Sequence, residues 1–288
     1  MDASDLPQLP RSRADLHGIG APRPRKEDAR LLAGQGQFVG DLRLPDMLEV
    51  AFVRSPVAHG RIRGITKPEG AENAVFTMDD LLGVQPIRAN SALPGFKPSE
   101  QWPLARDKVR QVGETVAMCV AKTRAQAEDL AAGVQVEIDE LPAVVDMLSA
   151  RGGQASALVH EHWGDNIFLE TRIEADLTDI KARAPIVVKR HLRTARQSMA
   201  PIEGRGVVCQ WDSRLEQLVM HSAAQMPHIN RAGLSECLGI DQGKIRVIAP
   251  DVGGGFGYKG ILLPEECCLG WLAMHLRKPV RWIEDRRE

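Results

Sequence analysis

The chain has 288 residues, 43% of them hydrophobic, which is enough for two ordinary domains with separate cores. Its formal net charge is −1, and no block of lysine or arginine alternates with aromatic residues, so nucleic acid is not expected as a partner. No window approaches the run of about 18 apolar residues that a membrane span needs, and the first residues are acidic where a signal peptide would be basic. We therefore expect a soluble cytoplasmic protein that does not bind a membrane.

The cysteines are scattered and include no C-x-x-C pair, which is typical of reduced, mostly buried thiols and not of disulfides or zinc sites. The histidines also lack the spacing of a metal site, and His160 and His162 lie in a stretch that resembles a linker. We therefore expect no direct metal ligand among the side chains of this chain.

The first half of the chain is expected to be an arm followed by mixed α and β structure. Residues 1–27 are rich in proline and charge without periodicity, which predicts an N-terminal arm. Alternating apolar residues predict strands in two stretches: Met47–Arg54 and Val109–Ala121. Helices are expected to open at Thr77 and at Thr123, the second ending at Gly133.

The second half is expected to be a sheet-containing domain that follows a linker. Weak periodicity with proline, glycine and serine predicts the linker at residues 149–163. Strand-like patterns follow in five stretches: Ile167–Ala175, Ile186–Arg196, Gly206–Trp211, Leu215–Ser222 and Lys244–Ala249. Helices are expected over Asn230–Leu238, closed by Gly239, and from Pro264, which suits a first helical position.

A last strand is predicted at Pro279–Asp285, directly before the sequence stops. Because no polar tail or capping element follows it, we expect the second domain to lack its remainder. The strand would then form an unpaired sheet edge that invites association, or equally would be an ordinary edge strand at a natural C-terminus.

Residues 251–259 contain four glycines in five positions, between a predicted strand and a predicted helix. Such a loop exposes backbone N–H groups and admits a ligand closer than a β-carbon would permit, so it predicts an anion-binding site. It is not a Walker loop, because Lys259 follows Tyr258 and precedes Gly260. It is not a Rossmann loop either, because no helix begins directly after it.

Five segments carry motifs in a fixed order: residues 23–41 (RPRKEDARLLAGQGQFVGD), 52–60 (FVRSPVAHG), 112–117 (VGETVA), 224–228 (AQMPH) and 253–257 (GGGFG). Together they resemble the molybdenum-binding large subunit of the molybdenum hydroxylases, the family of xanthine dehydrogenase, aldehyde oxidase and carbon monoxide dehydrogenase. The family more often has proline where Thr115 stands.

The resemblance implies an α+β fold, with an α/β hammerhead domain at residues 28–148 and the leading part of a molybdopterin-binding α+β domain at residues 164–288. It also implies a molybdenum–molybdopterin cofactor that is shared with a partner chain. Iron–sulfur (2Fe–2S) and FAD groups are expected on partner subunits, which would receive the two electrons of each turnover.

The resemblance also implies a set of cofactor-binding residues: Gln225, Gly254, Gly255, Phe256 and Gly257. Gln225 would donate a hydrogen bond towards an oxo ligand of molybdenum without binding the metal directly, since an amide can donate where a carboxylate would repel. Phe256 and Gly257 would lie beside the metal and its dithiolene sulfurs. Taken alone, Gln225 would be a solvated loop residue and Phe256 a core residue.

Two departures from the family pattern bear on function. The family's general-base glutamate lies in a Gly-x-Gly-Glu segment that this sequence lacks, so we assign no catalytic residue to this chain and expect the base on a partner. Where xanthine-oxidising members carry a purine-binding glutamate, this chain has Gly260, which argues against purine as the substrate.

We therefore expect one half of a split large subunit, inactive alone, in an enzyme that oxidises an aldehyde or an N-heteroaromatic compound with water-derived oxygen. The alternatives are a non-catalytic assembly or cofactor-delivery relative, a truncated remnant, or a subunit of the carbon monoxide dehydrogenase type. The expected partners are the C-terminal half of the large subunit on another chain, the iron–sulfur and FAD subunits, and a small-molecule substrate.

Several charged residues lie outside these motifs and are not expected to be part of the cofactor site. We interpret a tract of four arginines as a solvated face, with an acidic partner subunit or the cofactor phosphates as alternatives: Arg190, Arg193, Arg196 and Arg205. Glu114 and Glu203 are expected to be ordinary carboxylates.

Overall fold

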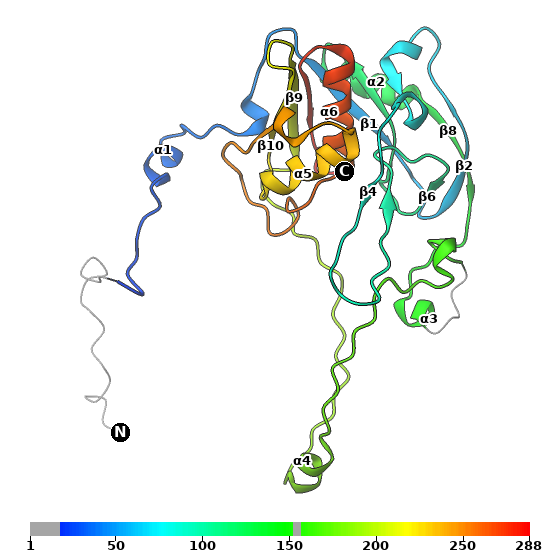
Figure 1. Cartoon of the computed structure of the whole chain (residues 1–288), viewed down its shortest axis with the longest axis vertical. Helices are drawn as coiled ribbons and strands as arrows, with labels where there is room; N and C mark the ends of the chain where they lie inside the picture. The colour runs from blue at the N-terminus through cyan, green and yellow to red at the C-terminus, as the bar shows by residue number, and fades with distance from the viewer. Residues whose placement is uncertain (1–17, 152–156) are drawn as a thin grey trace. The chain divides into compact units, whose positions relative to one another are not determined.

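The computed structural model describes residues 18–151 and 157–288. The chain divides into two units, Met1–Gln37 and Phe38–Glu288. In the first unit the described residues form one short helix, α1 (Asp28–Leu32). Most of the predicted arm lies outside the described residues. All other helices and strands of the described chain belong to the second unit (Figure 1).

A seven-stranded sheet is the main element of the second unit. Its strands follow the spatial order β11 (Ile245–Ile248), β10 (Gln217–Ser222), β9 (Gly206–Asp212), β12 (Val280–Ile283), β1 (Leu48–Arg54), β7 (Thr115–Ala121) and β3 (Val75–Phe76). The strand patterns expected near β1, β9, β10 and β11 are confirmed. The sheet contains strands from both predicted domains, and the boundaries at residues 28–148 and 164–288 stay a prediction.

The final strand, β12, lies inside the sheet and not at its edge. It pairs with β9 on one side, with Trp282 opposite Val207, and in parallel with β1 on the other, with Val280 opposite Leu48. Val280 and Trp282 are both buried. Both expectations for this strand, an unpaired edge and an ordinary edge, are therefore wrong, because β1 from the first half of the chain lies beside it.

Two smaller sheets complete the β-structure of the described chain. One contains β6 (Lys108–Val109), β2 (Gly60–Thr66) and β8 (Gln135–Glu140), and the other contains β4 (Ile87–Arg88) and β5 (Glu100–Gln101). The predicted β-rich stretch Val109–Ala121 is thus divided between two sheets, since β6 pairs with β2 while β7 pairs with β1.

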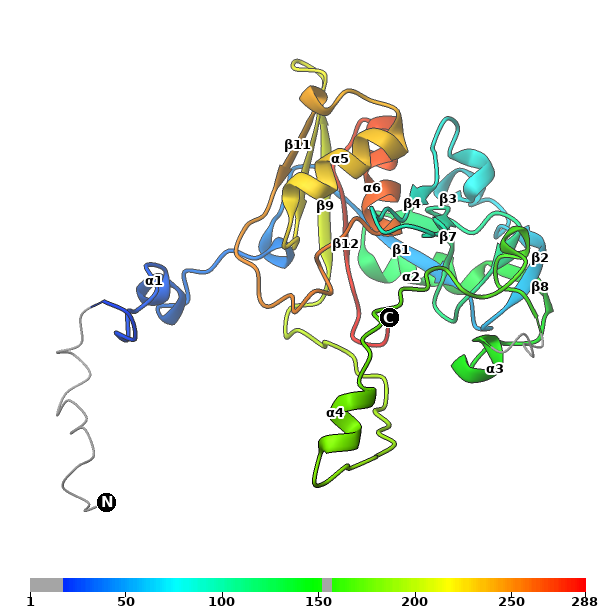
Figure 2. The ribbon, with the colours of Figure 1, turned by 60° about the horizontal axis from the view of Figure 1, so that its bottom comes forward.

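The helix α6 (Pro264–Leu276) supplies much of the main hydrophobic core. It begins with proline as predicted, and every residue from Pro264 to Ala273 is buried. The helix is covered so completely because β9, β10 and β12 contact it, and so does α5 (Pro227–Leu238) (Figure 2). As expected, α5 ends at Gly239, whose φ of 66° glycine adopts without cost.

Of the two helices expected in the first half, one is confirmed. The helix α2 (Arg124–Gly133) is capped by Thr123, whose hydroxyl accepts the N–H of Gln126 at 3.3 Å. At Thr77 the helix prediction is wrong, because only a three-residue 3₁₀ turn forms there. The Asp80 carboxylate accepts both the N–H and the hydroxyl of Thr77 and so closes the chain into that turn.

The strands expected at Ile167–Ala175 and Ile186–Arg196 do not form, so this prediction is wrong. Both stretches lack strand pairing, and the short helix α4 (Thr178–Arg183) lies between them (Figure 1). The pattern of apolar residues suits a strand, but no other strand of the described chain pairs with either stretch.

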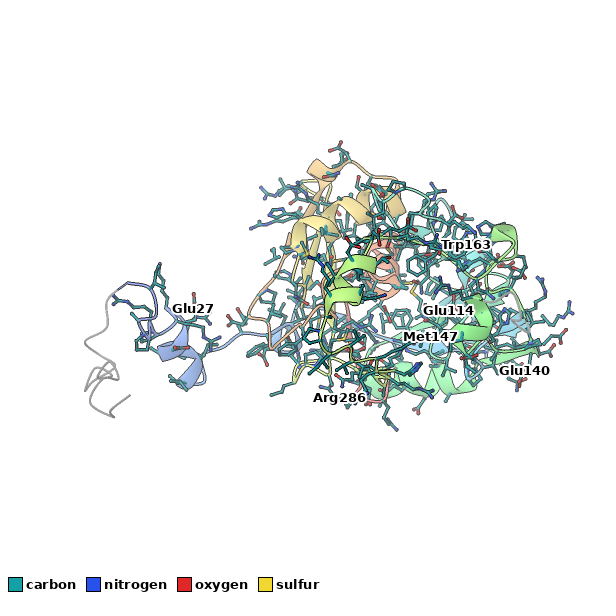
Figure 3. The ribbon with its side chains drawn as sticks, turned by 90° about the horizontal axis from the view of Figure 1, so that it is seen from below. Glu27, Glu114, Glu140, Met147, Trp163 and Arg286 are labelled. Atoms are coloured by element: carbon teal, nitrogen blue, oxygen red, sulfur yellow. The ribbon has the colours of Figure 1, made fainter. Side chains whose placement is uncertain are left out.

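The predicted linker, residues 149–163, begins within α3 (Met147–Arg151), and its last residues are anchored to β6. Lys108, whose side chain is 1% exposed, donates to the carbonyl oxygens of Leu158 and Val159, both at 3.2 Å, and pairs with Glu161 at 2.8 Å. That hydrogen bond lowers the pKa of Glu161 to about 2. Trp163, labelled in Figure 3, stacks on His160 at the end of this anchored stretch.

Candidate functional site

The glycine loop, residues 251–260, connects β11 to α6 and has an unusual backbone. Gly254, Phe256 and Gly257 have φ values of 99°, 55° and 91°, all in the left-handed region. Glycine adopts this region freely, but a residue such as Phe256 does so rarely and at a cost of about 1–3 kcal/mol. Backbone strain of this kind is concentrated at functional loops.

Gln225 attaches the loop to the chain just before α5. Its side-chain Oε1 accepts the N–H of Gly257 at 2.9 Å and the N–H of Lys259 at 3.3 Å. The backbone N–H of Gln225 donates to the backbone carbonyl of Lys259. A β-carbon at Gly255 would lie 2.4 Å from the carboxamide carbon of Gln225, so this approach requires glycine. The Nε2 of Gln225 donates no hydrogen bond within residues 18–151 and 157–288 and is free to donate elsewhere.

Glu203 holds the other end of the loop. Its Oε2 accepts the N–H of Gly253 at 2.7 Å and the ammonium group of Lys259 at 2.9 Å. The side chain of Lys259 is only 1% exposed, so this ion pair is largely shielded from water. Glu203 is therefore a support of the loop and not an ordinary carboxylate. Sequence reasoning missed it because its partner lies 56 residues further along the chain.

The tip of the loop presents three consecutive N–H groups. Those of Gly254, Gly255 and Phe256 make no hydrogen bond with other described residues, whereas the N–H groups of Gly253 and Gly257 are both bonded. Adjacent unpaired N–H groups in a turn of this kind are typical of an anion-binding loop.

Phe256 is 72% exposed, so the interpretation of this residue as core is wrong. Its ring lies over Gly254, where an added β-carbon would meet it at 3.0 Å. The structure thus brings together the five residues that the sequence analysis grouped: Gln225, Gly254, Gly255, Phe256 and Gly257.

A buried ionic cluster lies next to the loop. Arg205 binds both carboxylate oxygens of Glu265, at 2.7 and 2.9 Å, and also pairs with Glu284 at 2.9 Å. Arg54 reaches Glu265 at 2.9 Å. Burial alone would raise the pKa of Glu265, but the attraction of the two guanidinium groups outweighs it and the pKa is lowered. The cluster connects to the loop through Tyr258, whose hydroxyl donates to Glu284.

Glu266, the next residue of α6, has a pKa shifted in the opposite direction. It accepts hydrogen bonds from Ser222, Asn230 and the N–H of Leu263. Burial raises its pKa to about 7, and the hydrogen bond from Ser222 offsets this only in part. Two adjacent carboxyls thus differ because Glu265 has arginine partners and Glu266 has only neutral ones.

The remaining charged residues do not join the site. Arg205 is only 13% exposed, whereas Arg190, Arg193 and Arg196 are exposed, so the four arginines do not act as one set. Glu114, labelled in Figure 3, is buried beside the turn before β7 and accepts the N–H of Arg110; burial raises its pKa. Among the described residues, no group of three or more His, Cys, Asp or Glu side chains could hold a metal ion.

Comparison with known proteins assigns this arrangement to a family. Residues 159–288 match the family model of the molybdopterin cofactor-binding domain, and residues 33–142 match that of the aldehyde oxidase and xanthine dehydrogenase a/b hammerhead domain. The chain is similar to the nicotine 6-hydroxylase large subunit of Paenarthrobacter nicotinovorans, with 36% identity over 94% of this chain and 34% of that protein. It is also similar to the carbon monoxide dehydrogenase large chain of Hydrogenophaga pseudoflava, with 34% identity over 94% of this chain and 36% of that protein.

Solved structures agree with this assignment. Quinoline 2-oxidoreductase from Pseudomonas putida 86 superposes with a TM-score of 0.85 and 40% identity, over 91% of this chain and 34% of that chain. Aldehyde oxidoreductase from Desulfovibrio gigas superposes with a TM-score of 0.81 and 26% identity, over 91% of this chain and 30% of that chain.

The chain therefore belongs to the molybdenum hydroxylase family. It matches part of the large subunit and spans about a third of the length of these relatives. The predicted α+β fold with hammerhead and molybdopterin-binding domains is confirmed, and so is the cofactor class, molybdenum–molybdopterin. Within the described residues, no helix is long and apolar enough to cross a membrane.

Proposed function

We propose that this chain supplies one wall of the cofactor site in a cytoplasmic molybdenum hydroxylase. The rest of the large subunit, including the general-base glutamate, would come from a second polypeptide, and the iron–sulfur and FAD groups from further subunits. The observation that carries the proposal is the arrangement of Gln225 and the glycine loop, with one amide donor beside three backbone donors, all unpaired among the described residues.

The residues that would hold the cofactor are Gln225, Gly254, Gly255, Phe256 and Gly257. Bound molybdenum–molybdopterin supplies the two-electron redox chemistry. The Nε2 of Gln225 would donate to an oxygen of this group, and the N–H groups of residues 254–256 would stabilise its negative charge. The site fits such a negatively charged group because four N–H donors, the backbone N–H groups of residues 254–256 and Nε2 of Gln225, are unpaired within the described chain.

We propose an N-heteroaromatic compound as the substrate, with an aldehyde as the second choice. Support comes from two relatives whose names specify nicotine and quinoline, at 36% and 40% identity. Carbon monoxide is a further candidate because of the 34% identity to a carbon monoxide dehydrogenase. Purine is disfavoured by Gly260, as the resemblance to xanthine-oxidising members indicates.

The test is to purify the chain from its own host under native conditions, identify what co-purifies, and assay molybdenum and the oxidation of quinoline, nicotine and carbon monoxide. We expect molybdenum together with a polypeptide that carries a Gly-x-Gly-Glu segment. A metal-free chain, alone or with unrelated proteins, would instead favour a binding protein or a remnant.

A variant of Gln225 tests the role of the amide. Gln225→Ala is expected to leave the complex assembled but to lower turnover by roughly 10–100-fold, the usual cost of losing a group that orients a metal site. Gln242→Ala, at an exposed glutamine in the turn before β11, is the matched control and should leave turnover unchanged. An unchanged rate in Gln225→Ala would remove this residue from the site.

A further inference from the structure

Residues 185–200, the basic segment, have a strand-like sequence but pair with no strand of the described chain. Their first half is rich in β-branched residues, Ile186, Val187 and Val188, which favour strands. No backbone–backbone hydrogen bond joins this segment to any other residue of the described chain. Unpaired N–H and C=O groups along a stretch of this length are a template for pairing with another strand.

The basic segment also exposes an apolar surface. Ile186, Val188 and Leu192 alternate along the chain and are 80%, 69% and 87% exposed. Val187 and Met199, which would lie on the other face of an extended strand, are 62% and 46% exposed. Apolar side chains at alternating positions are what a neighbouring strand would cover.

The charge of the basic segment is of one sign. Residues 185–200 include Lys189, Arg190, Arg193 and Arg196 but no aspartate or glutamate. Within the described chain, none of these four side chains forms an ion pair, in contrast to Arg205, which has two carboxylate partners. The occupant of this surface is therefore expected to be acidic.

We propose that the basic segment is the docking surface for an extended, acidic segment of the polypeptide that completes the large subunit, which pairs with it as a β-strand. This inference rests on the proposed function. It draws on the coverage of the relatives, because about two thirds of their length has no counterpart in this chain. Backbone hydrogen bonds would provide affinity, and the apolar and basic side chains along the segment would provide specificity.

A second copy of this chain is a poorer occupant. Two basic segments side by side would place four positive charges opposite four others without a compensating carboxylate. Like charges across neighbouring strands destabilise their pairing. Charge thus selects a different polypeptide as the partner.

The experiment compares hydrogen exchange in two samples of the full chain, one purified alone and one in the complex isolated from its host. We expect amides of residues 185–200 to exchange at least about tenfold more slowly in the complex, as a newly paired strand would. The double variant Arg190→Glu/Arg193→Glu should lose co-purification of the completing polypeptide. The matched control, Lys181→Glu/Arg183→Glu on α4, makes the same charge change outside the segment and should retain it.

Equally fast exchange in the complex would overturn the inference, as would a complex that contains only copies of this chain or a chain that purifies alone. Equal loss of the partner in both double variants would also overturn it, because the effect would then be general charge. Molybdenum is assayed separately in the same samples. A protected segment without molybdenum contradicts the proposed function alone, and molybdenum with an unprotected segment contradicts the docking surface alone.

Discussion

The strand β9 and the basic segment lie close together in the sequence and both have strand-like sequences, yet only one is a strand. β9 pairs with β10 on one side and β12 on the other, and its Val207, Val208 and Cys209 are buried. Residues 185–200 pair with no strand of the described chain and are exposed throughout. The difference shows that β-propensity alone does not make a strand. A strand-like sequence forms a strand only where a neighbouring element offers pairing and burial.

The same contrast holds for charge. Arg205, just before β9, is fixed by Glu265 and Glu284, which lie 60 and 79 residues further along the chain. Arg190 and Arg193 lack such partners in the described chain. Arg205, whose partners lie in the chain, is largely shielded from water and supports the fold. Arg190 and Arg193 are exposed and available for association.

The largest expected effect is the loss of the carboxylate at the centre of the ionic cluster. Glu265→Ala would remove the carboxylate that Arg205 and Arg54 share, leaving Arg205 with Glu284 and Arg54 with Glu288. We expect the loss of this central partner to lower the free energy of unfolding by about 3–5 kcal/mol. The control is Glu128→Ala, which removes the exposed partner of Arg124 and should cost less than about 1 kcal/mol. Urea unfolding measures both, and equal losses would contradict the distinction between buried and exposed pairs.

A matched pair of valines tests the comparison of β9 and the basic segment directly. Val208→Ala should destabilise the chain by about 2–3 kcal/mol, because Val208 is fully buried and its truncation leaves a cavity. Val188→Ala should change stability by no more than about 0.5 kcal/mol in the chain alone, since Val188 is 69% exposed. A comparable loss at Val188 would mean that the segment is already packed in the isolated chain.

The smallest expected effect is a pH dependence caused by Glu266. Its pKa is about 7 in the folded chain against an ordinary value of 4.5, so the folded state holds the proton more tightly. The stabilisation is complete below about pH 4.5 and is lost as the pH rises through about 7. Between about pH 5 and pH 8 the free energy of unfolding should fall by roughly 1–3 kcal/mol more than in Glu266→Gln. A pH-independent difference between the two proteins would show that Glu266 is already ionised.

The sequence predicted features whose signals are local. Pro264 at the start of α6, Gly239 at the end of α5 and Thr123 as a cap each act within a few residues, and all three are confirmed. The grouping of Gln225 with the glycine loop also followed from a motif. Features that depend on distant residues were missed, such as the pairing of β12 with β1 and the support of the loop by Glu203, since no local pattern encodes them.

The most direct test of the cofactor site is the molybdenum and pterin content of the host complex with Gly254→Val. Gly254 has a φ of 99° and a β-carbon there would approach Phe256 and Pro201, so valine should block cofactor binding. Gly70→Val is the matched control, with a φ of 76° but open space around it. We expect the Gly254→Val complex to lose molybdenum and pterin while the Gly70→Val complex keeps both. Retention of the cofactor in Gly254→Val would contradict the assignment of this loop to the cofactor site.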